Sequence, residues 1–298
     1  MEKLLLIDAN NLLHRVYWVH KSYAKSTSVP HLFLNSIKKC YSDFTPDITY
    51  LAWDSKIHYG ETNFRKTGLE EYKQNRPKEH DDDIYQHEGV IKELCSHLGL
   101  KNIYPGVLEA DDVIYWLCNY YNENEKVVVS ADQDLLQLVN DTTTVFSPIK
   151  KYMVSLDNFE ELSGIQKPHF IKYKALIGDK SDNIPGIPRV GDKTAKKLLN
   201  SDDDLKSQLS EDNYQLFESN MNLVDLSRAQ KFHPDEHLIY EEQVEKLNTH
   251  EQNFEKFENL AENSGLSSIL NSIDNWKQTF RKSDFIQRLQ AFLNEKDK

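Results

Sequence analysis

The sequence predicts an α/β protein whose central, mostly parallel sheet is flanked by helices. Three short apolar runs contain β-branched residues, which is typical of strands buried on both faces of a sheet. They span residues 4–7, 48–53 and 126–130. Helical stretches lie between them, at about 32–40, 84–98 and 111–121. Because strands that alternate with helices form parallel sheets, these runs predict one shared sheet.

The pattern changes after the third run. Residues 144–147 and 151–155 predict a last strand or a hairpin, and Asp157 is expected to cap the next helix. There follow a helix at 169–177, a loop at 178–193 and a helix at 194–199. The remainder, about 200–298, is acidic, polar and mostly helical in pattern. We therefore expect a sheet-based core followed by helices.

Composition bounds the class of protein. The chain has 298 residues, 39% of them hydrophobic, which suffices for a packed core and argues against a disordered chain. No run approaches the roughly 18 apolar residues of a membrane helix, and the N-terminus lacks a signal-peptide pattern. Cys40, Cys95 and Cys118 are far apart, which predicts buried thiols in a reducing cytoplasm and excludes a disulfide scaffold. The net charge of −12 disfavours a nucleic-acid partner unless the acids gather at one place.

Nine acids do fall at the ends of predicted elements, and they account for most of the net charge. They are Asp8, Asp54, Glu109, Asp111, Asp112, Asp132, Asp134, Asp179 and Asp182. Like charges about 4 Å apart repel by about 4 kcal/mol at an effective dielectric constant near 20, so such a cluster requires cations. Mg²⁺ prefers oxygen ligands, and two such ions about 4 Å apart promote in-line displacement at phosphorus. The alternative is that each acid caps a helix or lies in solvent.

Basic residues lie close to these acids in two segments. In residues 56–80, Tyr72 offers a ring for stacking on a base, and Lys73 and Arg76 offer charge for a phosphate. The alternative for this segment is an exposed amphipathic helix with ordinary surface cations. In residues 167–197, glycines permit tight turns, and Thr194 is expected to open a helix whose amides meet a phosphate. The flanking lysines predict a non-specific grip on a duplex backbone, although a plain helical hairpin has the same pattern.

These residues together resemble the 5′-nuclease family, which includes flap endonucleases and the 5′→3′ exonuclease domain of bacterial DNA polymerase. The resemblance covers about residues 3–200. It rests on Leu-Ile-Asp8, Trp-Asp54, Phe-Arg65, Tyr-Lys73-Gln-Asn-Arg76-Pro, Glu109-Ala-Asp111-Asp112, Ser-Ala-Asp132-Gln-Asp134 and Gly-Asp179-Lys-Ser-Asp182-Asn-Ile-Pro-Gly186. Their order and spacing carry the likeness. The chain length and the polar helical tail look most similar to the phage ribonuclease H type.

The resemblance implies a role for each of these residues. Asp8, Asp54, Glu109 and Asp111 would hold one metal ion, and Asp132, Asp134 and Asp182 a second, with Asp112 and Asp179 in outer or second-site positions. Lys73, Arg76 and Arg65 would act at the scissile phosphate, and Tyr72 would stack on the end base. The duplex would lie on Gly186, Ile187, Arg189, Gly191, Lys193, Thr194, Lys196 and Lys197, with K⁺ in the turn at 187–193.

The family also implies the domains and the activity. The expected domains are a PIN-like, metal-dependent nuclease core at 1–160 with an arch at about 56–98, a helix–turn–helix-like element at 161–225 and a helical region at 226–298. The expected activity is 5′→3′ exonuclease and flap endonuclease cleavage with two or more Mg²⁺ ions, for which Mn²⁺ substitutes. Substrates would be branched or nicked duplex DNA and RNA–DNA hybrids, during removal of primers or flaps in replication. The C-terminal region would dock a single-strand-binding or other replication protein, in the cytoplasm or, if phage-encoded, the host cytoplasm.

One segment departs from the family pattern, and two other functions stay open. Residues 78–83, Lys-Glu-His-Asp-Asp-Asp, are acidic where a basic or aromatic arch is expected, and they would repel a threaded strand. A phosphatase with Asp8 as nucleophile is one alternative, although Asp8-Ala-Asn10 lacks a second acid as proton donor. A DNA-structure-binding protein on an inactive nuclease scaffold is the other, although a pure binder gains nothing from the acids.

Overall fold

The computed structural model describes residues 2–23, 26–55, 63–75 and 81–281. Within them, a six-stranded sheet has the order β3-β2-β1-β4-β5-β6. The strands are β1 (Lys3–Asp8), β2 (Ile48–Ala52), β3 (Lys101–Ile103), β4 (Glu125–Val129), β5 (Thr143–Ser147) and β6 (Tyr152–Val154). Neighbouring strands are parallel except for β5 and β6, which form an antiparallel hairpin. The predicted mostly parallel α/β sheet is confirmed.

Strand β1 shows why the sheet is covered on both sides. Leu4 and Leu6 pack into one apolar cluster, whereas Leu5 and Ile7 pack into another, because successive side chains of a strand point to opposite faces. All four side chains are fully buried. A strand buried in this way reads in sequence as a continuous apolar run, as residues 4–7 do.

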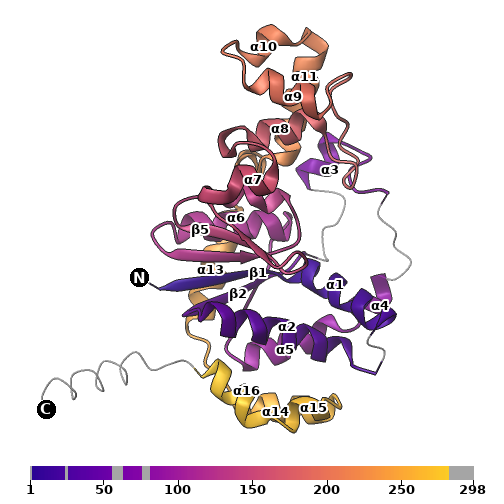
Figure 1. Ribbon diagram of the computed structural model, residues 1–298. Coiled ribbons are helices and arrows are strands. Elements are labelled where there is room, and N and C mark those ends of the chain that lie inside the picture. The colour runs from indigo at the N-terminus through magenta and orange to yellow at the C-terminus, as the bar shows by residue number, and fades with distance from the viewer. Residues whose placement is uncertain (1, 24–25, 56–62, 76–80, 282–298) are drawn as a thin grey trace, which may run out of the picture.

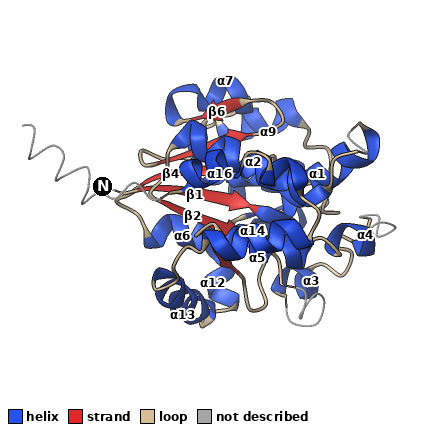
Figure 2. Cartoon of the chain, turned by 90° about the horizontal axis from the view of Figure 1, so that it is seen from below, coloured by secondary structure: helices blue, strands red, loops and turns tan. Residues whose placement is uncertain are grey.

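Helices cover both faces of the sheet (Figures 1 and 2). The face with Leu5 carries α1 (Ala9–Ser22), α2 (Val29–Phe44), α4 (Asp81–Tyr85), α5 (Glu88–His97), α14 (Phe254–Asn263), α15 (Ser267–Leu270) and α16 (Ile273–Phe280). The side with Leu4 carries α6 (Ala110–Tyr120), α7 (Phe159–Ser163) and α13 (Glu236–Asn248). Helices α8 (Phe170–Ile177), α9 (Asp192–Leu199), α10 (Leu205–Gln208) and α11 (Glu211–Val224) contribute to the same apolar cluster but extend away from the strands (Figure 1). The shorter elements are α3 (Phe64–Gly68), α12 (Ala229–Phe232), η1 (Asp134–Leu138), η2 (Leu156–Asn158), η3 (Lys167–His169) and η4 (Leu226–Arg228).

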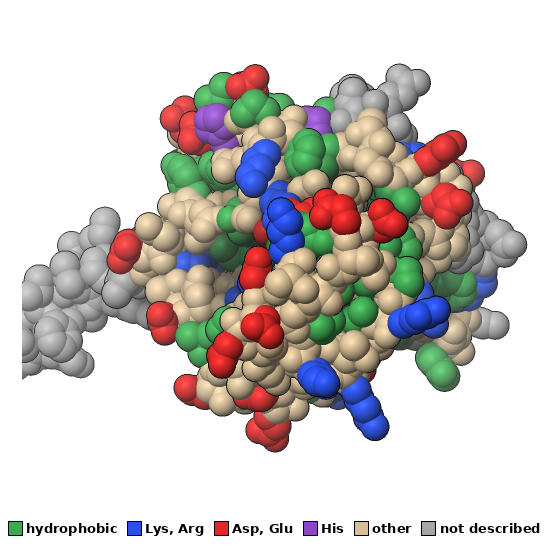
Figure 3. Space-filling model, turned by 90° about the horizontal axis from the view of Figure 1, so that it is seen from above, with side chains coloured by type: hydrophobic (Ala, Val, Ile, Leu, Met, Phe, Trp, Pro, Cys, Tyr) green, Lys and Arg blue, Asp and Glu red, His purple; other side chains and the backbone are tan. Residues whose placement is uncertain are grey.

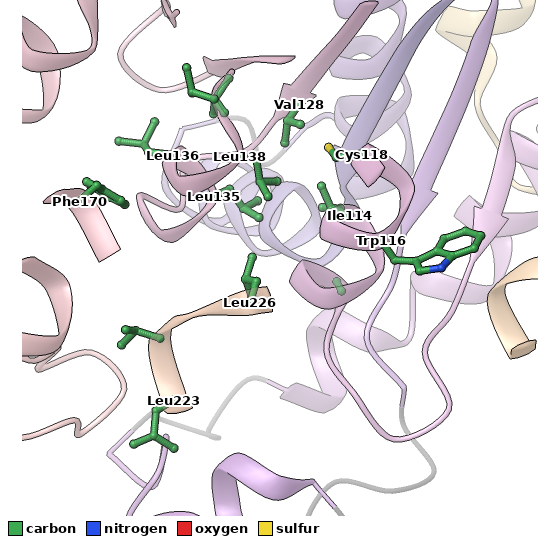
Figure 4. Packing of buried hydrophobic residues seen from close by; sticks show 14 of the residues in the cluster. Ile114, Trp116, Cys118, Val128, Leu135, Leu136, Leu138, Phe170, Leu223 and Leu226 are labelled. Carbon is green, nitrogen blue, oxygen red and sulfur yellow. The ribbon is translucent and has the colours of Figure 1, made fainter. Parts of the chain in front are cut away.

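Among the described residues, 226–281 do not form a body of their own. Helix α13 contacts β3 from the face with Leu4, whereas α14 and α16 pack on α5 and α2 on the opposite face. Figure 4 shows Leu135 and Leu138 of η1 beside Val128 of β4 and Leu226 of η4. Residues 226–281 therefore pack against both sides of the core. The expected domain limits at 160 and 225 stay a prediction.

Several predicted element boundaries are wrong. The helix predicted at 84–98 is two helices, α4 and α5, and α1 and β3 had no sequence prediction. Ser155 rather than Asp157 caps the next turn, because its side chain and that of Asn158 form a reciprocal capping box. Helix α9 begins at Asp192 with Gly191 as its N-cap, so Thr194 lies inside the helix and does not open it.

The composition led to two expectations, one about the cysteine side chains and one about membrane-spanning helices. Cys40, Cys95 and Cys118 are free, buried thiols, and burial raises the pKa of Cys40 to about 11. Among the helices of the described residues, none joins the length to the apolar character that a membrane crossing requires.

Candidate active site

The carboxyl edge of the sheet begins with Asp8, the last residue of β1 and the N-cap of α1. Its side chain is 6% exposed. One carboxylate oxygen accepts the Asn11 amide N–H at 3.0 Å, and the other accepts the Ser130 hydroxyl at 2.8 Å. The register places Asp8 beside Ala52 of β2 and the end of β4 beside Ile7. The ends of three neighbouring strands therefore meet at Asp8.

Two asparagines after Asp8 tie these strand ends together. The Asn10 Oδ1 atom accepts the Asp54 amide N–H at 3.0 Å, and the Asn11 Oδ1 atom accepts the Ala131 amide N–H at 3.2 Å. Each amide side chain thus fixes the loop that follows a neighbouring strand. Sequence reasoning missed both roles, although the Asp8-Ala-Asn-Asn run directly after a strand was the available signal.

The N-terminus of α6 brings in the next acids. Asp54 accepts the Ala110 amide N–H at 2.9 Å, which joins the loop after β2 to the first turn of this helix. Glu109 is the N-cap of α6 and is 6% exposed. Asp111, two residues later in the first turn of the helix, is half-buried. Helix N-termini favour negative charge, which lowers the cost of collecting these carboxylates.

Arg65 and Asp112 form a closed ion pair, which contradicts the predicted role of Arg65 at the scissile phosphate and leaves the outer or second-site position of Asp112 a prediction. The two Arg65 terminal nitrogens each donate to one Asp112 oxygen at 2.7 Å, and both side chains are 2% exposed. Arg65 Nε also donates to the Leu223 carbonyl at 3.0 Å, and Asp112 accepts the Glu109 amide N–H. With every charged atom engaged and buried, Arg65 does not reach a phosphate and Asp112 does not ligate a metal ion directly. The pair instead fastens α3 and α11 to the start of α6.

Lys73 and Tyr72 both point at Glu109. Lys73 Nζ lies 2.6 Å from one Glu109 oxygen, and the Tyr72 hydroxyl donates to the other at 3.1 Å. Burial would raise the pKa of Glu109, but Lys73 and Arg65 lower it to about 2. The Tyr72 ring is 6% exposed and packs in the core, which contradicts its predicted stacking on a base. Lys73 has a positive φ of 56°, and Arg76 lies outside the described residues.

A second set of acids comes from η1 and the loop after α8. We call Asp134, Asp179 and Asp182 the outer carboxylates, and Asp8, Asp54, Glu109, Asp111 and Asp132 the inner carboxylates. Lys174, on the last turn of α8, places its Nζ atom 2.7 Å from both Asp134 and Asp179. Sequence reasoning missed this lysine, because nothing in the chain order links residue 174 to residue 134. Asp182 is buried and lies 3.9 Å from Lys73 Nζ.

The loop that carries the outer carboxylates is held by close backbone packing. A Cβ atom on Gly178, whose φ is 72°, would lie 2.4 Å from the Ile184 carbonyl oxygen. A Cβ on Gly186 would lie 2.4 Å from the Ile177 carbonyl oxygen, so close packing requires a glycine here, and the predicted approach of DNA to it stays a prediction. From beneath, the buried Asn220 amide donates to the carbonyls of Ala175 and Pro185 at 2.9 and 2.7 Å. No sequence signal marked Asn220.

Electrostatics link the carboxylates into one chain of neighbours. Burial, together with the nearby charges of Asp54 and Asp132, raises the pKa of Asp8 to about 7, although two hydrogen bonds oppose the shift. Burial, Asp132 and Asp8 raise the pKa of Asp111 well above its ordinary value.

The outer carboxylates differ from one another. Burial and Asp132 raise the pKa of Asp134 to about 6 despite Lys174, whereas Lys174 and Ser181 overcome burial and lower that of Asp179 to about 2. Asp132 is therefore the neighbour that joins the inner carboxylates to Asp134.

The inner and outer carboxylates are ligands of the type that a hard divalent cation prefers, although their oxygens do not converge into a complete metal site. All are carboxylate oxygens, the ligands that Mg²⁺ and Mn²⁺ prefer, and their mutual repulsion raises several pKa values. Within the described ranges, no three Asp, Glu, His or Cys side chains converge closely enough to hold a metal ion. Two ammonium groups, those of Lys73 and Lys174, supply positive charge among them.

The predicted duplex-binding turn is exposed in part. Arg189, Lys193, Thr194 and Lys197 are exposed, and Arg189 has a positive φ of 65°. Ile187 is 2% exposed, so its side chain belongs to the core and does not reach DNA.

The rest of the turn is tied to neighbouring groups. Lys196 pairs with Asp192 at 2.9 Å, and Gly191 is exposed at the start of α9. Figure 3 shows acidic and basic side chains interspersed over the face seen from above.

Comparison with protein families gives two adjoining matches. Residues 3–164 match the 5′-3′ exonuclease N-terminal resolvase-like domain, and residues 165–294 match the 5′-3′ exonuclease C-terminal SAM fold. A 5′-3′ exonuclease of Mycoplasmopsis pulmonis is 33% identical over 203 residues, which are 67% of each chain. One from Bacillus subtilis is 35% identical over 210 residues, 66% of this chain and 69% of the relative. DNA polymerase I of Caldicellulosiruptor bescii is 31% identical over 66% of this chain but only 24% of the polymerase.

Solved structures share the fold. The T5 5′-exonuclease with bound zinc has a TM-score of 0.68 at 21% identity, covering 83% of this chain and 99% of the other. The bacteriophage T5 flap endonuclease in complex with DNA and metal ions has a TM-score of 0.64 at 22% identity, covering 80% and 99%. At these identities the likeness establishes the architecture of sheet and helices.

Proposed function

The chain belongs to the 5′-3′ exonuclease family, and we propose that it is a metal-dependent, structure-specific nuclease acting at 5′ ends and 5′ flaps of duplex DNA. The observation that carries this proposal is the chain of carboxylates at the carboxyl edge of the sheet, from Asp54 through Asp8 and Asp132 to Asp134. Burial of so many acids in one place is costly unless cations are bound there. A helix cap or surface role does not account for it.

The carboxylates would hold two divalent ions, Mg²⁺ or Mn²⁺. When bound, the ions would polarise the phosphodiester and activate water for in-line displacement. Asp8, Asp54, Asp111 and Asp132 are the inner ligands that we assign, and Asp134, Asp179 and Asp182 the outer ones; Glu109 is left out of the ligands because Lys73 and Tyr72 engage its two oxygens. Asp8 and Asp54 are held by hydrogen bonds at the strand ends, so they present fixed positions. Asp112 is omitted because Arg65 engages both of its oxygens.

Lys73 is the cation that we assign to the scissile phosphate. Its side chain is 18% exposed, and its ammonium contacts Glu109 and lies 4.9 Å from the centre of the Tyr72 ring. Glu109 and Tyr72 thereby orient the lysine at the edge where the substrate would lie. A positive group placed there stabilises charge that develops on the phosphate during displacement.

The duplex would lie on the exposed part of the turn before α9 and on the exposed side of that helix. Arg189, Lys193, Thr194 and Lys197 offer charge and a hydroxyl to backbone phosphates, which positions a duplex without reading its sequence. A K⁺ ion in the turn at 187–193 and cleavage of RNA–DNA hybrids belong to the same proposal. The solvent-facing side of the C-terminal helices would bind a single-strand-binding or other replication protein.

Cleavage of a labelled duplex with a 5′ flap tests the proposal directly. We expect incision in Mg²⁺ or Mn²⁺ and none in EDTA, and a nicked and an RNA-primed duplex in parallel would rank the substrates. The variant Lys73→Ala should lower kcat by about 10²-fold with KM little changed, because the lysine acts on developing charge. Absence of incision with either metal ion would refute the proposed activity, and a loss of affinity alone would refute the role of Lys73.

A further inference from the structure

Lys174 is the one cation of the described residues that contacts two outer carboxylates at once. Its helix, α8, ends at Ile177, and Gly178 then turns the chain so that Asp179 faces back toward the lysine. Asp134 reaches the same ammonium from η1, the first turn after the loop that follows β4. The ammonium therefore bridges the sheet edge to the loop of the helical region.

The surroundings of this bridge are sheltered. The side chains of Lys174, Asp134 and Asp179 are 14%, 19% and 18% exposed. Asp179 is also held by the Ser181 amide and hydroxyl, and Asp134 donates its amide N–H to Asp132 at 2.8 Å. A charge contact in such a place is screened less than one in open solvent.

We propose that Lys174 is a positioning residue, the counterion of the outer carboxylates, and that it sets how tightly they hold a divalent ion. This inference rests on the proposed function, because it takes Asp134 and Asp179 as metal ligands. A lysine ammonium and a divalent cation compete for the same oxygens, so the lysine weakens the binding of the ion. In the absence of metal, the same lysine keeps two repelling acids side by side.

Two opposite effects follow when the charge is removed. The variant Lys174→Met keeps the length of the side chain but leaves Asp134 and Asp179 without their shared cation. Without metal, the protein should melt at a lower temperature, because the two acids repel each other. With Mn²⁺, its weakest site should bind about tenfold more tightly, because the competing charge is gone. A residue that only supports the fold would weaken both properties together.

The experiment is a Mn²⁺ titration followed by electron paramagnetic resonance, with melting in EDTA measured in parallel. It compares the wild type with Lys174→Met, Lys174→Gln, Lys174→Arg and Lys172→Met, the last an exposed lysine of the same helix. We expect tighter Mn²⁺ binding for Lys174→Met and Lys174→Gln, and wild-type binding for Lys174→Arg and Lys172→Met. Circular dichroism identifies any variant that does not fold. If either Lys174→Met or Lys174→Gln fails to fold, the other still tests the loss of the charge.

The possible results separate the inference from the proposed function. If the wild type binds Mn²⁺ and the Met and Gln variants bind it equally or more weakly, Lys174 is not a competing counterion and the inference is overturned. If the wild type binds no Mn²⁺, the proposed metal-dependent function fails, and the inference fails with it.

Discussion

The inner and outer carboxylates are built by different means. Inner acids at the strand ends are held mainly by the first turns of α1 and α6: Asp8 by the Asn11 amide and the Ser130 hydroxyl, and Asp54 by the Ala110 amide. The outer pair, Asp134 and Asp179, is joined by a lysine side chain from a helix outside the sheet. The backbone amides of Asn11 and Ala110 are fixed in the first turns of α1 and α6, whereas a lysine side chain has several rotatable bonds.

This difference indicates a division of labour. The inner carboxylates form the part of the site that the core positions by itself. Two of the outer carboxylates, Asp179 and Asp182, belong to the chain segment from α8 to α9, which also carries the exposed basic residues between 189 and 197. A duplex bound on that turn would act on the same segment that holds Asp179 and Asp182. The following variants test whether the two sets are separable.

The largest effect is expected for Asp132→Asn, which removes the acid between the two sets. Asp132 accepts the Asp134 amide and raises the pKa values of Asp8, Asp111 and Asp134. An asparagine keeps the hydrogen bond and loses the charge, so flap cleavage should fall by on the order of 10³-fold. Binding of the flap duplex, measured by fluorescence anisotropy, should stay near that of the wild type. The exposed Asp141→Asn serves as control, and wild-type turnover by Asp132→Asn would remove this residue from the site.

The next effect separates the inner carboxylates from the ion pair behind them. Arg65→Met leaves Asp112 buried without its partner, so the free energy of unfolding should drop by about 3–5 kcal/mol. The double variant Arg65→Met/Asp112→Leu should recover most of that loss, because it removes both charges together. Urea denaturation measures both. If Arg65→Met instead lost cleavage while its stability stayed unchanged, Arg65 would have the catalytic role that the sequence predicted.

The same division decides what the sequence could predict. Acids that end apolar runs, such as Asp8 and Asp54, were placed together correctly, because parallel strands end at one edge of the sheet. The contacts of Lys174 and Asn220 depend on how α8 and α11 meet the core, and that packing leaves no periodic signal.

The sequence-based predictions also failed where residues expected at the surface are buried. Arg65 and Tyr72 lie in a locally basic segment that reads as solvent-facing, yet both are buried against α6. Ile187 was assigned to the duplex for its place in a turn, although its side chain fills the core. A charge pattern along the chain reports composition and does not report which side chains are enclosed.

The metal-free protein should show the cost of the inner site as a pH dependence. The folded pKa of Asp8 is about 7, above its ordinary 3.8, so the folded state retains a proton that the unfolded chain releases. Stability from this group is complete below about pH 4 and is lost as the pH rises to about 7, a change of roughly 2–4 kcal/mol. Asp8→Asn removes this loss, so in EDTA its stability relative to the wild type should increase from pH 4 to 7. Asp141→Asn serves as the control. If the stabilities of the wild type and Asp8→Asn changed with pH in the same way, the raised pKa assigned to Asp8 would be contradicted.

The smallest effect should touch the outer carboxylates alone. Asn220→Ala removes the amide that donates to the Ala175 and Pro185 carbonyls beneath the loop of Asp179 and Asp182. One buried and one partly buried acceptor without their donor should lower stability by about 1–2 kcal/mol, and the loosened loop should raise the Mn²⁺ needed for half-maximal cleavage. Ser219→Ala, an exposed neighbour on α11, is the matched control. If Asn220→Ala lowers stability and leaves the Mn²⁺ requirement unchanged, the loop keeps its ligands in place without this support. The outer carboxylates would then be as firmly built as the inner ones, and the contrast between the two sets would not hold.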